Sequence, residues 1–320
     1  MSSKTAQRIT DAGFSASPPP SATALQDPNA GPGAVERPHR LLTVCGGTNI
    51  GAERKKNQDT FVIAELESGH ASRPCVRTEV WVQRPGLLML VCDGMGGAAA
   101  GEVASRIAAT SIKHHLEHEG ENVGQAPTHC LERAVHTAND AILEEARAHP
   151  EERGMGTTCT AAILSPDALV VAQVGDSRAY LLRDGKLRQL TRDQTVAAQL
   201  VEAGALAPEE VRRFPFRNVL SQALGTRGGV DVVLSDEELR EGDRVLLCSD
   251  GLYGPVADES IADILHTSGD VAVAAEKLIA AAVSAGGHDD VTVVVAECGR
   301  LERRPPPPGG SECERPSDRV

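Results

Sequence analysis

Aspartate residues stand at the ends of apolar, strand-like runs in this chain of 320 residues. Asp93 follows "LLMLVC", Asp176 follows "ALVVAQVG" and Asp250 follows "RVLLCS". Asp289 and Asp290 stand just before "VTVVV". If these strand ends meet at one rim of a layered fold, the carboxylates repel one another unless a cation lies between them. Carboxylates without His or Cys ligand spacing favour Mg²⁺ or Mn²⁺ over Zn²⁺, so the pattern predicts a centre with two such ions.

The elements that would position these aspartates follow from hydrophobic periodicity. Runs rich in Val, Ile and Leu predict strands that begin near residues 41, 60, 86, 158, 168, 179, 243 and 290. Apolar residues at steps of three and four predict helices over 101–118, 127–148, 258–266 and 271–284. Two pairs of helices do not fit strict alternation with strands. The order therefore favours an α+β architecture of packed antiparallel sheets flanked by helices.

Composition limits the partners and the compartment. The formal net charge of −13 argues against binding to nucleic acid or to an anionic membrane surface, because both need cationic patches. No apolar run approaches the roughly 20 residues that span a bilayer, and no signal-peptide pattern is present. The cysteines are widely spaced, as in a reduced protein. We therefore expect a cytoplasmic protein.

The two ends of the chain differ in composition from its middle. Residues 1–37 are rich in Ser, Pro, Ala and Gly and cannot bury enough apolar surface to offset chain entropy, which predicts a disordered leader. Residues 300–320 contain the run "PPPP" and predict a disordered, proline-rich tail. A single folded domain is expected over residues 38–299.

Seven motifs in a fixed order carry a resemblance to a known family. They are "TNIGAERKKNQD", "VCDGMGGAAAGEVAS", "GTTCTAAIL", "VAQVGDSRAYLLRDGKLRQLTRDQT", "NVLSQALGT", "LLCSDGLYG" and "GGHDDVTVVV". In these motifs the chain resembles the metal-dependent Ser/Thr protein phosphatases of type 2C, the PPM family, in the short bacterial form. The resemblance implies a central antiparallel β-sandwich flanked by pairs of helices, with the metal centre in a cleft at one end. It also implies hydrolysis of phosphoserine and phosphothreonine by a metal-bridging water, without a covalent intermediate.

The same resemblance implies roles at the metal centre. Asp93 matches the ligand that bridges two Mg²⁺ or Mn²⁺ ions, and the Gly94 carbonyl matches a ligand of the second ion. Asp250 and Asp289 match ligands of the first ion. Asp59 matches a group that orients metal-bound water.

Two further positions concern the substrate and a third ion. Arg54 matches the arginine that holds the substrate phosphate. The planar guanidinium of an arginine suits this role, because it can bind two phosphate oxygens at once. Asp176 matches the ligand of a third, weaker ion in bacterial relatives. The alternative for Asp176 is a turn residue that accepts main-chain hydrogen bonds or pairs with Arg178. The segment 191–218 resembles the mobile flap of bacterial members, and its alternative is an ordinary surface insertion.

The chain departs from the family pattern at several positions. Met95 stands where animal relatives carry a His proposed as general acid, so the proton donor is open, with metal-bound water as the preferred candidate. Asp290 stands where Asn usually follows the last ligand, and it either competes with Asp289 as a ligand or adds repulsion. Gln194 replaces the usual His.

The resemblance implies phosphorylated proteins as partners, including a Ser/Thr protein kinase of the same cell, and we expect a monomer. Two other functions stay open, namely a catalytically silent regulatory or binding domain of the same fold and a hydrolase of small phosphate esters. The retained aspartates argue against the silent domain. The run "CGRLERR" fits the spacing of cysteine-based phosphatases, but the prolines after it cannot continue the helix that such a site requires.

Overall fold

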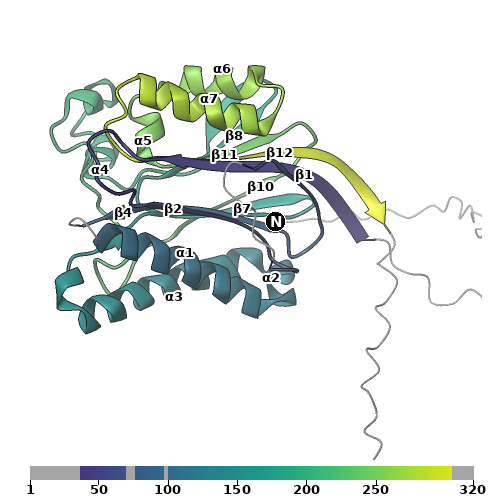
Figure 1. Ribbon diagram of the computed structural model, residues 1–320, viewed down its shortest axis with the longest axis horizontal. Helices are drawn as coiled ribbons and strands as arrows, with labels where there is room; N and C mark the ends of the chain where they lie inside the picture. Colours follow the sequence, from purple (N-terminus) through teal and green to yellow (C-terminus); the bar gives the residue numbers. More distant parts are fainter. Residues whose placement is uncertain (1–36, 70–75, 97–99, 305–320) are drawn as a thin grey trace, which may run out of the picture. The chain divides into compact units, whose positions relative to one another are not determined.

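A computed structural model describes residues 37–69, 76–96 and 100–304 of the chain. The predicted leader therefore lies outside the described residues except for Arg37, as does the tail from residue 305. Within the described part, two antiparallel sheets pack face to face, and helices cover the outer face of each sheet (Figure 1). This layered arrangement confirms the predicted α+β fold.

The first sheet has six strands. In spatial order they are β3 (Thr78–Val82), β1 (Arg37–Asn49), β12 (Val291–Arg304), β11 (Arg244–Cys248), β8 (Arg178–Arg183) and β9 (Lys186–Gln189). The outer face of this sheet carries α5 (Asp250–Tyr253), α6 (Asp258–Thr267) and α7 (Val271–Ser284) (Figure 1). Asp184 and Gly185 both adopt positive φ in the β8–β9 turn, the conformation that makes Asp-Gly a common hairpin dipeptide.

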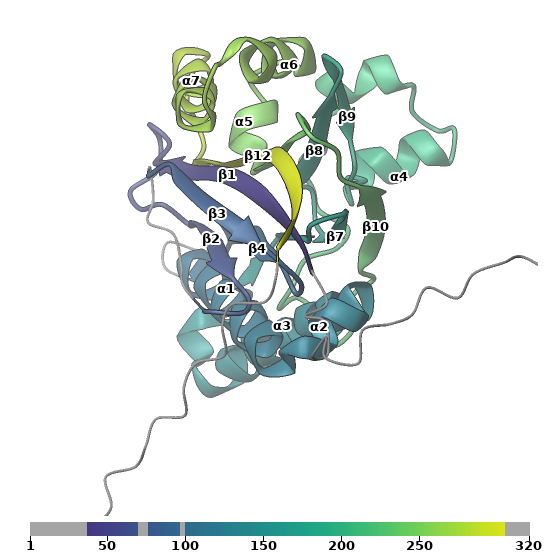
Figure 2. The same cartoon turned by 90° about the vertical axis from the view of Figure 1, so that its right-hand side faces the viewer.

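The second sheet has the spatial order β10 (Val233–Glu238), β7 (Ala168–Val174), β6 (Cys159–Leu164), β4 (Leu87–Met95) and β2 (Asp59–Glu65). The short β5 (Gly156–Thr157) pairs with the end of β4. The helices α1 (Ala100–Glu119), α2 (Glu121–Gln125) and α3 (Pro127–Ala148) lie beside this sheet, as Figure 2 shows from a second direction. The connections contain η1 (Pro150–Glu152), α4 (Val196–Glu202) and η2 (Pro208–Arg213).

Strand β4 explains why the layers form. Its side chains alternate between two apolar clusters: Leu88 and Leu90 face α1 and α3, whereas Leu87 and Met89 face the other sheet. All four side chains are buried, because both faces of the strand are covered. A strand in this position needs a continuous apolar run, and "LLMLVC" supplies it.

The last strand corrects a predicted boundary. β12 runs to Arg304, five residues beyond the expected domain end at residue 299, and pairs with β1 from Asn49↔Val291 to Arg37↔Arg304. Main-chain pairing with β1 accounts for the extension, which the polar sequence "RLERR" did not indicate. Among the described residues, no helix combines the length and the apolar character needed to cross a bilayer.

Candidate active site

Predicted site residues lie at one end of both sheets, where several strands begin or end. Because neighbouring strands are antiparallel, the end of β4 lies beside the start of β2, and the end of β11 lies beside the start of β12. Asp93 lies near the end of β4, and the residue paired with it on β2 is Asp59. Asp250 begins α5, with only Ser249 between it and the end of β11, while Asp289 precedes β12. The topology therefore places carboxylates from four chain segments at corresponding strand ends.

Main-chain hydrogen bonds fix Asp93. Its N–H donates to Thr158 Oγ1 at 2.9 Å, and its carbonyl accepts from the Thr158 N–H at 2.8 Å. The hydroxyl of Thr157 donates to the same carbonyl at 2.8 Å. These contacts hold the backbone of Asp93 without using its carboxylate. Gly94 comes next, and a Cβ on it would lie 2.2 Å from the Gly101 carbonyl oxygen at the start of α1.

Asp59 is held by one of its two carboxylate oxygens. Ser249, which is buried, donates from its hydroxyl to Asp59 Oδ2 at 2.8 Å. The same hydroxyl accepts from the Thr292 N–H at 3.0 Å, so the serine joins the two sheets at the site. Sequence reasoning did not identify Ser249, whose position directly before Asp250 was the available signal.

Arg54 reaches Asp289 across the mouth of the site. Its Nε donates to Asp289 Oδ1 at 2.8 Å, and its Nη2 lies 2.5 Å from the same oxygen. Its Nη1 donates to Gln58 Oε1 at 3.3 Å. Both side chains of the ion pair are 39% exposed, so the guanidinium remains accessible to a phosphate from solvent. The predicted phosphate-binding residue thus contacts a predicted metal ligand.

The carboxylate of Asp290 bonds two main-chain N–H groups. It accepts from the Gly51 N–H at 3.0 Å through Oδ1 and from the Gln58 N–H at 2.8 Å through Oδ2. The residue is 2% exposed. Both oxygens thus bind the loop that carries Arg54, whereas Asp289 faces the guanidinium. In this structure, Asp290 serves as an anchor of that loop.

Burial, together with neighbouring charges, raises the pKa values of four carboxylates in the site. Burial, followed by the charge of Asp250, raises the pKa of Asp176 to about 8. Burial, followed by the charge of Asp289, raises the pKa of Asp250 to about 6, and burial raises the pKa of Asp59 to about 7. The pKa of Asp93 lies well above its usual range because of burial and then the charges of Asp59, Asp250, Asp176 and Asp289. The charges of four aspartates act on Asp93, which indicates that the five lie close to one another.

The cluster has the donor set of a divalent cation site. Oδ1 of Asp59 and Oδ1 of Asp250 are both buried without a hydrogen-bond partner. An unpartnered buried carboxylate oxygen is costly unless a cation lies beside it. Oxygen ligands without nitrogen or sulfur suit Mg²⁺ or Mn²⁺, so the residues present fit the predicted ions.

A cleft of about 910 Å³ opens beside Asp176, Asp250 and Asp289. Thr195, Ala198, Val211 and Arg217, from the segment predicted as a flap, line another part of it. This segment contains α4 and η2, and Thr195 caps α4 by accepting from the Ala198 N–H at 3.1 Å. The aspartates therefore lie at one side of a space large enough for a peptide side chain and its flanking residues.

The cysteine-based alternative has no support in the geometry. Cys298 is 1% exposed within β12. Burial raises the pKa of its thiol to about 12, which disfavours the nucleophilic thiolate.

Stacked antiparallel sheets between helices, with a carboxylate cluster and a cleft at one end of the strands, define the class of protein as a layered α+β protein with a candidate divalent-cation site. A family model described as protein phosphatase 2C matches residues 75–281. The chain is 43% identical over 212 residues to the serine/threonine protein phosphatase PstP of Mycobacterium tuberculosis, covering 66% of this chain and 40% of that protein. It is 35% identical over 217 residues to the serine/threonine phosphatase stp of Listeria welshimeri, covering 68% and 86%. The chain belongs to the protein phosphatase 2C family.

A solved structure agrees with this assignment. The catalytic domain of serine threonine protein phosphatase PstP, in complex with 2 manganese ions, has a TM-score of 0.67 and 36% identity. The match covers 81% of this chain and 100% of the solved one. Our chain spans only 40% of the length of the full mycobacterial relative.

Proposed function

We propose that this chain is a metal-dependent phosphatase that hydrolyses phosphoserine and phosphothreonine in phosphorylated proteins. The observation that carries the proposal is the cluster of Asp59, Asp93, Asp176, Asp250 and Asp289, in which two buried carboxylate oxygens lack any hydrogen-bond partner. Membership of the phosphatase family and the manganese ions of the PstP structure support the same chemistry.

We assign the residues as follows. Asp93, Asp250 and Asp289, with the Gly94 carbonyl, would hold two Mg²⁺ or Mn²⁺ ions, and Asp176 would hold a weaker third. Such ions activate water as a nucleophile and neutralise charge on the phosphoryl group. Asp59, which accepts a hydrogen bond from Ser249 and pairs with Asp93 across β2 and β4, would orient metal-bound water. Arg54 would bind phosphate oxygens at the mouth of the site.

The central experiment compares substrates and ions. We expect the purified protein with Mn²⁺ to release phosphate from phosphoserine and phosphothreonine peptides, and EDTA to abolish the release. Asp93→Asn and Asp250→Asn should each lose most of the turnover, because each removes charge from the cation site. Preference for small phosphate esters or nucleotides over phosphopeptides would favour the esterase alternative, and inactivity on all of them would favour the silent domain.

The role of Arg54 is tested separately. Arg54→Ala should raise KM for a phosphopeptide about 10-fold or more, since charge-assisted hydrogen bonds contribute about 1.5–3 kcal/mol. Lys56→Ala is a matched control, because Lys56 lies in the same loop and pairs with Glu102 at 3.2 Å. If Arg54→Ala mainly reduces Mn²⁺ affinity measured by calorimetry, its pairing with Asp289 is structural and the phosphate role is wrong.

We propose that the enzyme acts as a monomer in the cytoplasm and that its substrates include a Ser/Thr protein kinase. The six cysteines in the described part of the chain are buried, and their wide spacing along the sequence is that expected in a reducing compartment. Sedimentation of the full chain tests the monomer, and incubation with autophosphorylated bacterial Ser/Thr kinases tests the partner. A stable dimer, or kinases left phosphorylated while phosphopeptides are hydrolysed, would contradict these two points.

A further inference from the structure

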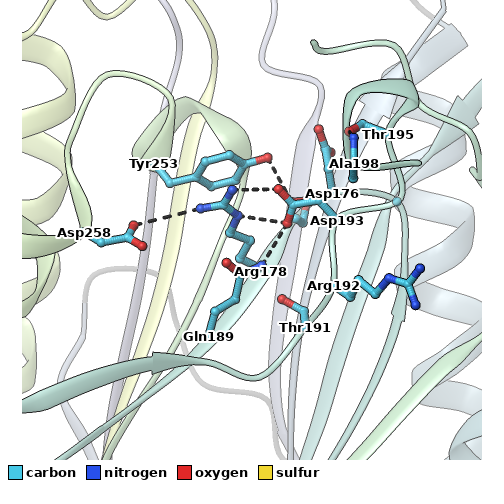
Figure 3. A network of polar contacts seen from close by, with 12 residues as sticks. Asp176, Arg178, Gln189, Thr191, Arg192, Asp193, Thr195, Ala198, Tyr253 and Asp258 are labelled. Atoms are coloured by element: carbon cyan, nitrogen blue, oxygen red, sulfur yellow. Dashed lines mark hydrogen bonds and ion pairs between the residues drawn. The ribbon is translucent and has the colours of Figure 1, made fainter. Parts of the chain in front are cut away.

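We propose that Arg178 and Tyr253 are positioning residues that hold the Asp176 turn against α5 and the base of the segment predicted as a flap. The inference rests on the proposed function, because it takes Asp176 and Asp250 as metal ligands. It concerns residues that are not ligands themselves but that join three separate chain segments, as Figure 3 shows.

Arg178 is the centre of this network. Its Nε and Nη2 donate to the two carboxylate oxygens of Asp193 at 2.9 and 2.6 Å, a bidentate pair. Its Nη1 donates to the Tyr180 hydroxyl at 2.8 Å. The side chain is only 19% exposed. Because Nε, Nη1 and Nη2 each donate a hydrogen bond, the guanidinium has one orientation, which a flexible ammonium could not reproduce.

Tyr253 lies against this guanidinium. The Arg178 Cζ atom is 3.7 Å from the centroid of the Tyr253 ring, within the range of a cation–π contact. The Tyr253 hydroxyl donates to the main-chain carbonyl of Asp176 at 2.9 Å. Tyr253 and Asp250 belong to the same single turn of helix, α5. One aromatic ring therefore connects the helix that begins at Asp250 with the turn that presents Asp176 (Figure 3).

The base of the segment predicted as a flap, Asp193 and Gln194, is joined by hydrogen bonds to the same turn. Gln194 accepts from the Gly175 N–H through its side-chain oxygen at 2.7 Å, and its own N–H donates to the Gly175 carbonyl at 2.9 Å. Asp193, which binds Arg178, immediately precedes Gln194, and Thr195 then caps α4. Residues 193 and 194 thus bond the chain on both sides of Asp176, at Gly175 and Arg178.

This arrangement has a functional consequence. Asp176 is 6% exposed, and its main chain is held by Tyr253, while Gly175 before it and Arg178 two residues after it are held by Gln194 and Asp193. A ligand with a fixed main chain loses less conformational freedom when it binds an ion. Loss of a positioning contact should therefore weaken ion binding and slow turnover without weakening capture of the substrate.

The test uses conservative variants with a matched control. Tyr253→Phe keeps the ring and removes the hydroxyl, whereas Arg178→Lys keeps the charge and removes the bidentate fork. Arg183→Lys is the control, because Arg183 lies at the other end of β8 and makes an equivalent bidentate pair with Asp243 at 2.8 and 2.6 Å. The measurements are Mn²⁺ titration by calorimetry, amide hydrogen exchange of the metal-free protein over residues 193–202, and kcat and KM for a phosphopeptide.

We expect Tyr253→Phe to weaken the weakest Mn²⁺ binding step about 10-fold, the usual scale for loss of a contact behind a ligand, and to lower kcat with little change in KM. We expect Arg178→Lys to speed amide exchange over residues 193–202, and Arg183→Lys to leave exchange and Mn²⁺ binding as in the wild type. Wild-type Mn²⁺ binding in Tyr253→Phe together with wild-type exchange in Arg178→Lys would overturn the inference. So would an equal effect of Arg183→Lys. Exchange and ion binding are measured without substrate, so they remain decisive even if the wild-type protein proves inactive on phosphopeptides.

Discussion

Asp290 binds both ends of the loop that carries Arg54, through the Gly51 and Gln58 N–H groups. An asparagine at this position offers one oxygen, and its NH₂ group would face the second N–H. We therefore expect Asp290→Asn to reduce the free energy of unfolding by about 1–3 kcal/mol, the cost of leaving a buried donor unsatisfied. Urea unfolding of the metal-free protein measures this loss.

Mn²⁺ titration separates Asp290 from its neighbour. Asp289→Asn should weaken binding strongly, because it removes a charged ligand, whereas Asp290→Asn should retain tight binding. The reverse order of effects would show that Asp290 is the ligand and that the assignment made from the resemblance is wrong.

At the scale of single residues, the sequence indicated the carboxylates but not what fixes them. Asp93, Asp176 and Asp250 could be found because each follows an apolar run. The alternative in which Asp176 pairs with Arg178 could not be judged, because it depends on which carboxylate is closer in space. In the structure, the bidentate partner of Arg178 is Asp193, fifteen residues along the chain. Sequence spacing carries no information about such a pair once a hairpin lies between the two residues.

At the scale of elements, the start of α1 and the end of β4 approach unusually closely. A Cβ on Gly94 would lie 2.2 Å from the Gly101 carbonyl oxygen and 2.6 Å from the Gln58 carbonyl oxygen. These are backbone atoms, so relief requires movement of α1 or of the Arg54 loop. We expect Gly94→Ala to destabilise the protein by about 1–3 kcal/mol and to weaken Mn²⁺ binding.

Gly269→Ala is the matched control for this substitution, because a Cβ there meets no atom within 4 Å. Thermal unfolding and Mn²⁺ titration of both variants give the comparison. If Gly94→Ala binds Mn²⁺ and unfolds like the Gly269→Ala control, the close approach of α1 does not shape the metal centre.

The elements that the sequence revealed best include helices with an apolar stripe packed against a sheet. The predicted helices 127–148 and 271–284 coincide with α3 and α7, since their apolar stripes face a sheet. Two edge strands, β3 and β10, were not predicted. β10 has the sequence "VLSDEE", whose acidic residues resemble a loop, and its strand form depends on main-chain pairing with β7. Tertiary pairing of this kind leaves no local pattern.

At the scale of the whole molecule, the carboxylate cluster links metal binding to stability. In the metal-free protein, burial raises the pKa values of Asp250, Asp59 and Asp176 to about 6, 7 and 8. The folded state therefore holds more protons than the unfolded chain, whose aspartates titrate near pH 4. Their contribution to stability is complete below about pH 4 and is lost as the pH rises through about 6 to 8.

We expect this loss to appear as a pH-dependent difference between the wild type and Asp250→Asn in EDTA. Each additional proton held by the folded state gives a slope of about 1.4 kcal/mol per pH unit, so the wild type should lose stability relative to the variant between pH 5 and pH 8. Asp263→Asn, on the exposed face of α6, is the control and should run parallel to the wild type. Saturating Mn²⁺ should remove the loss in the wild type, because cations replace protons as partners of the carboxylates. Urea unfolding at four pH values, with EDTA or Mn²⁺, measures all of these curves. A wild-type curve in EDTA that gains stability relative to Asp250→Asn as the pH rises would show that the cluster is satisfied without a metal.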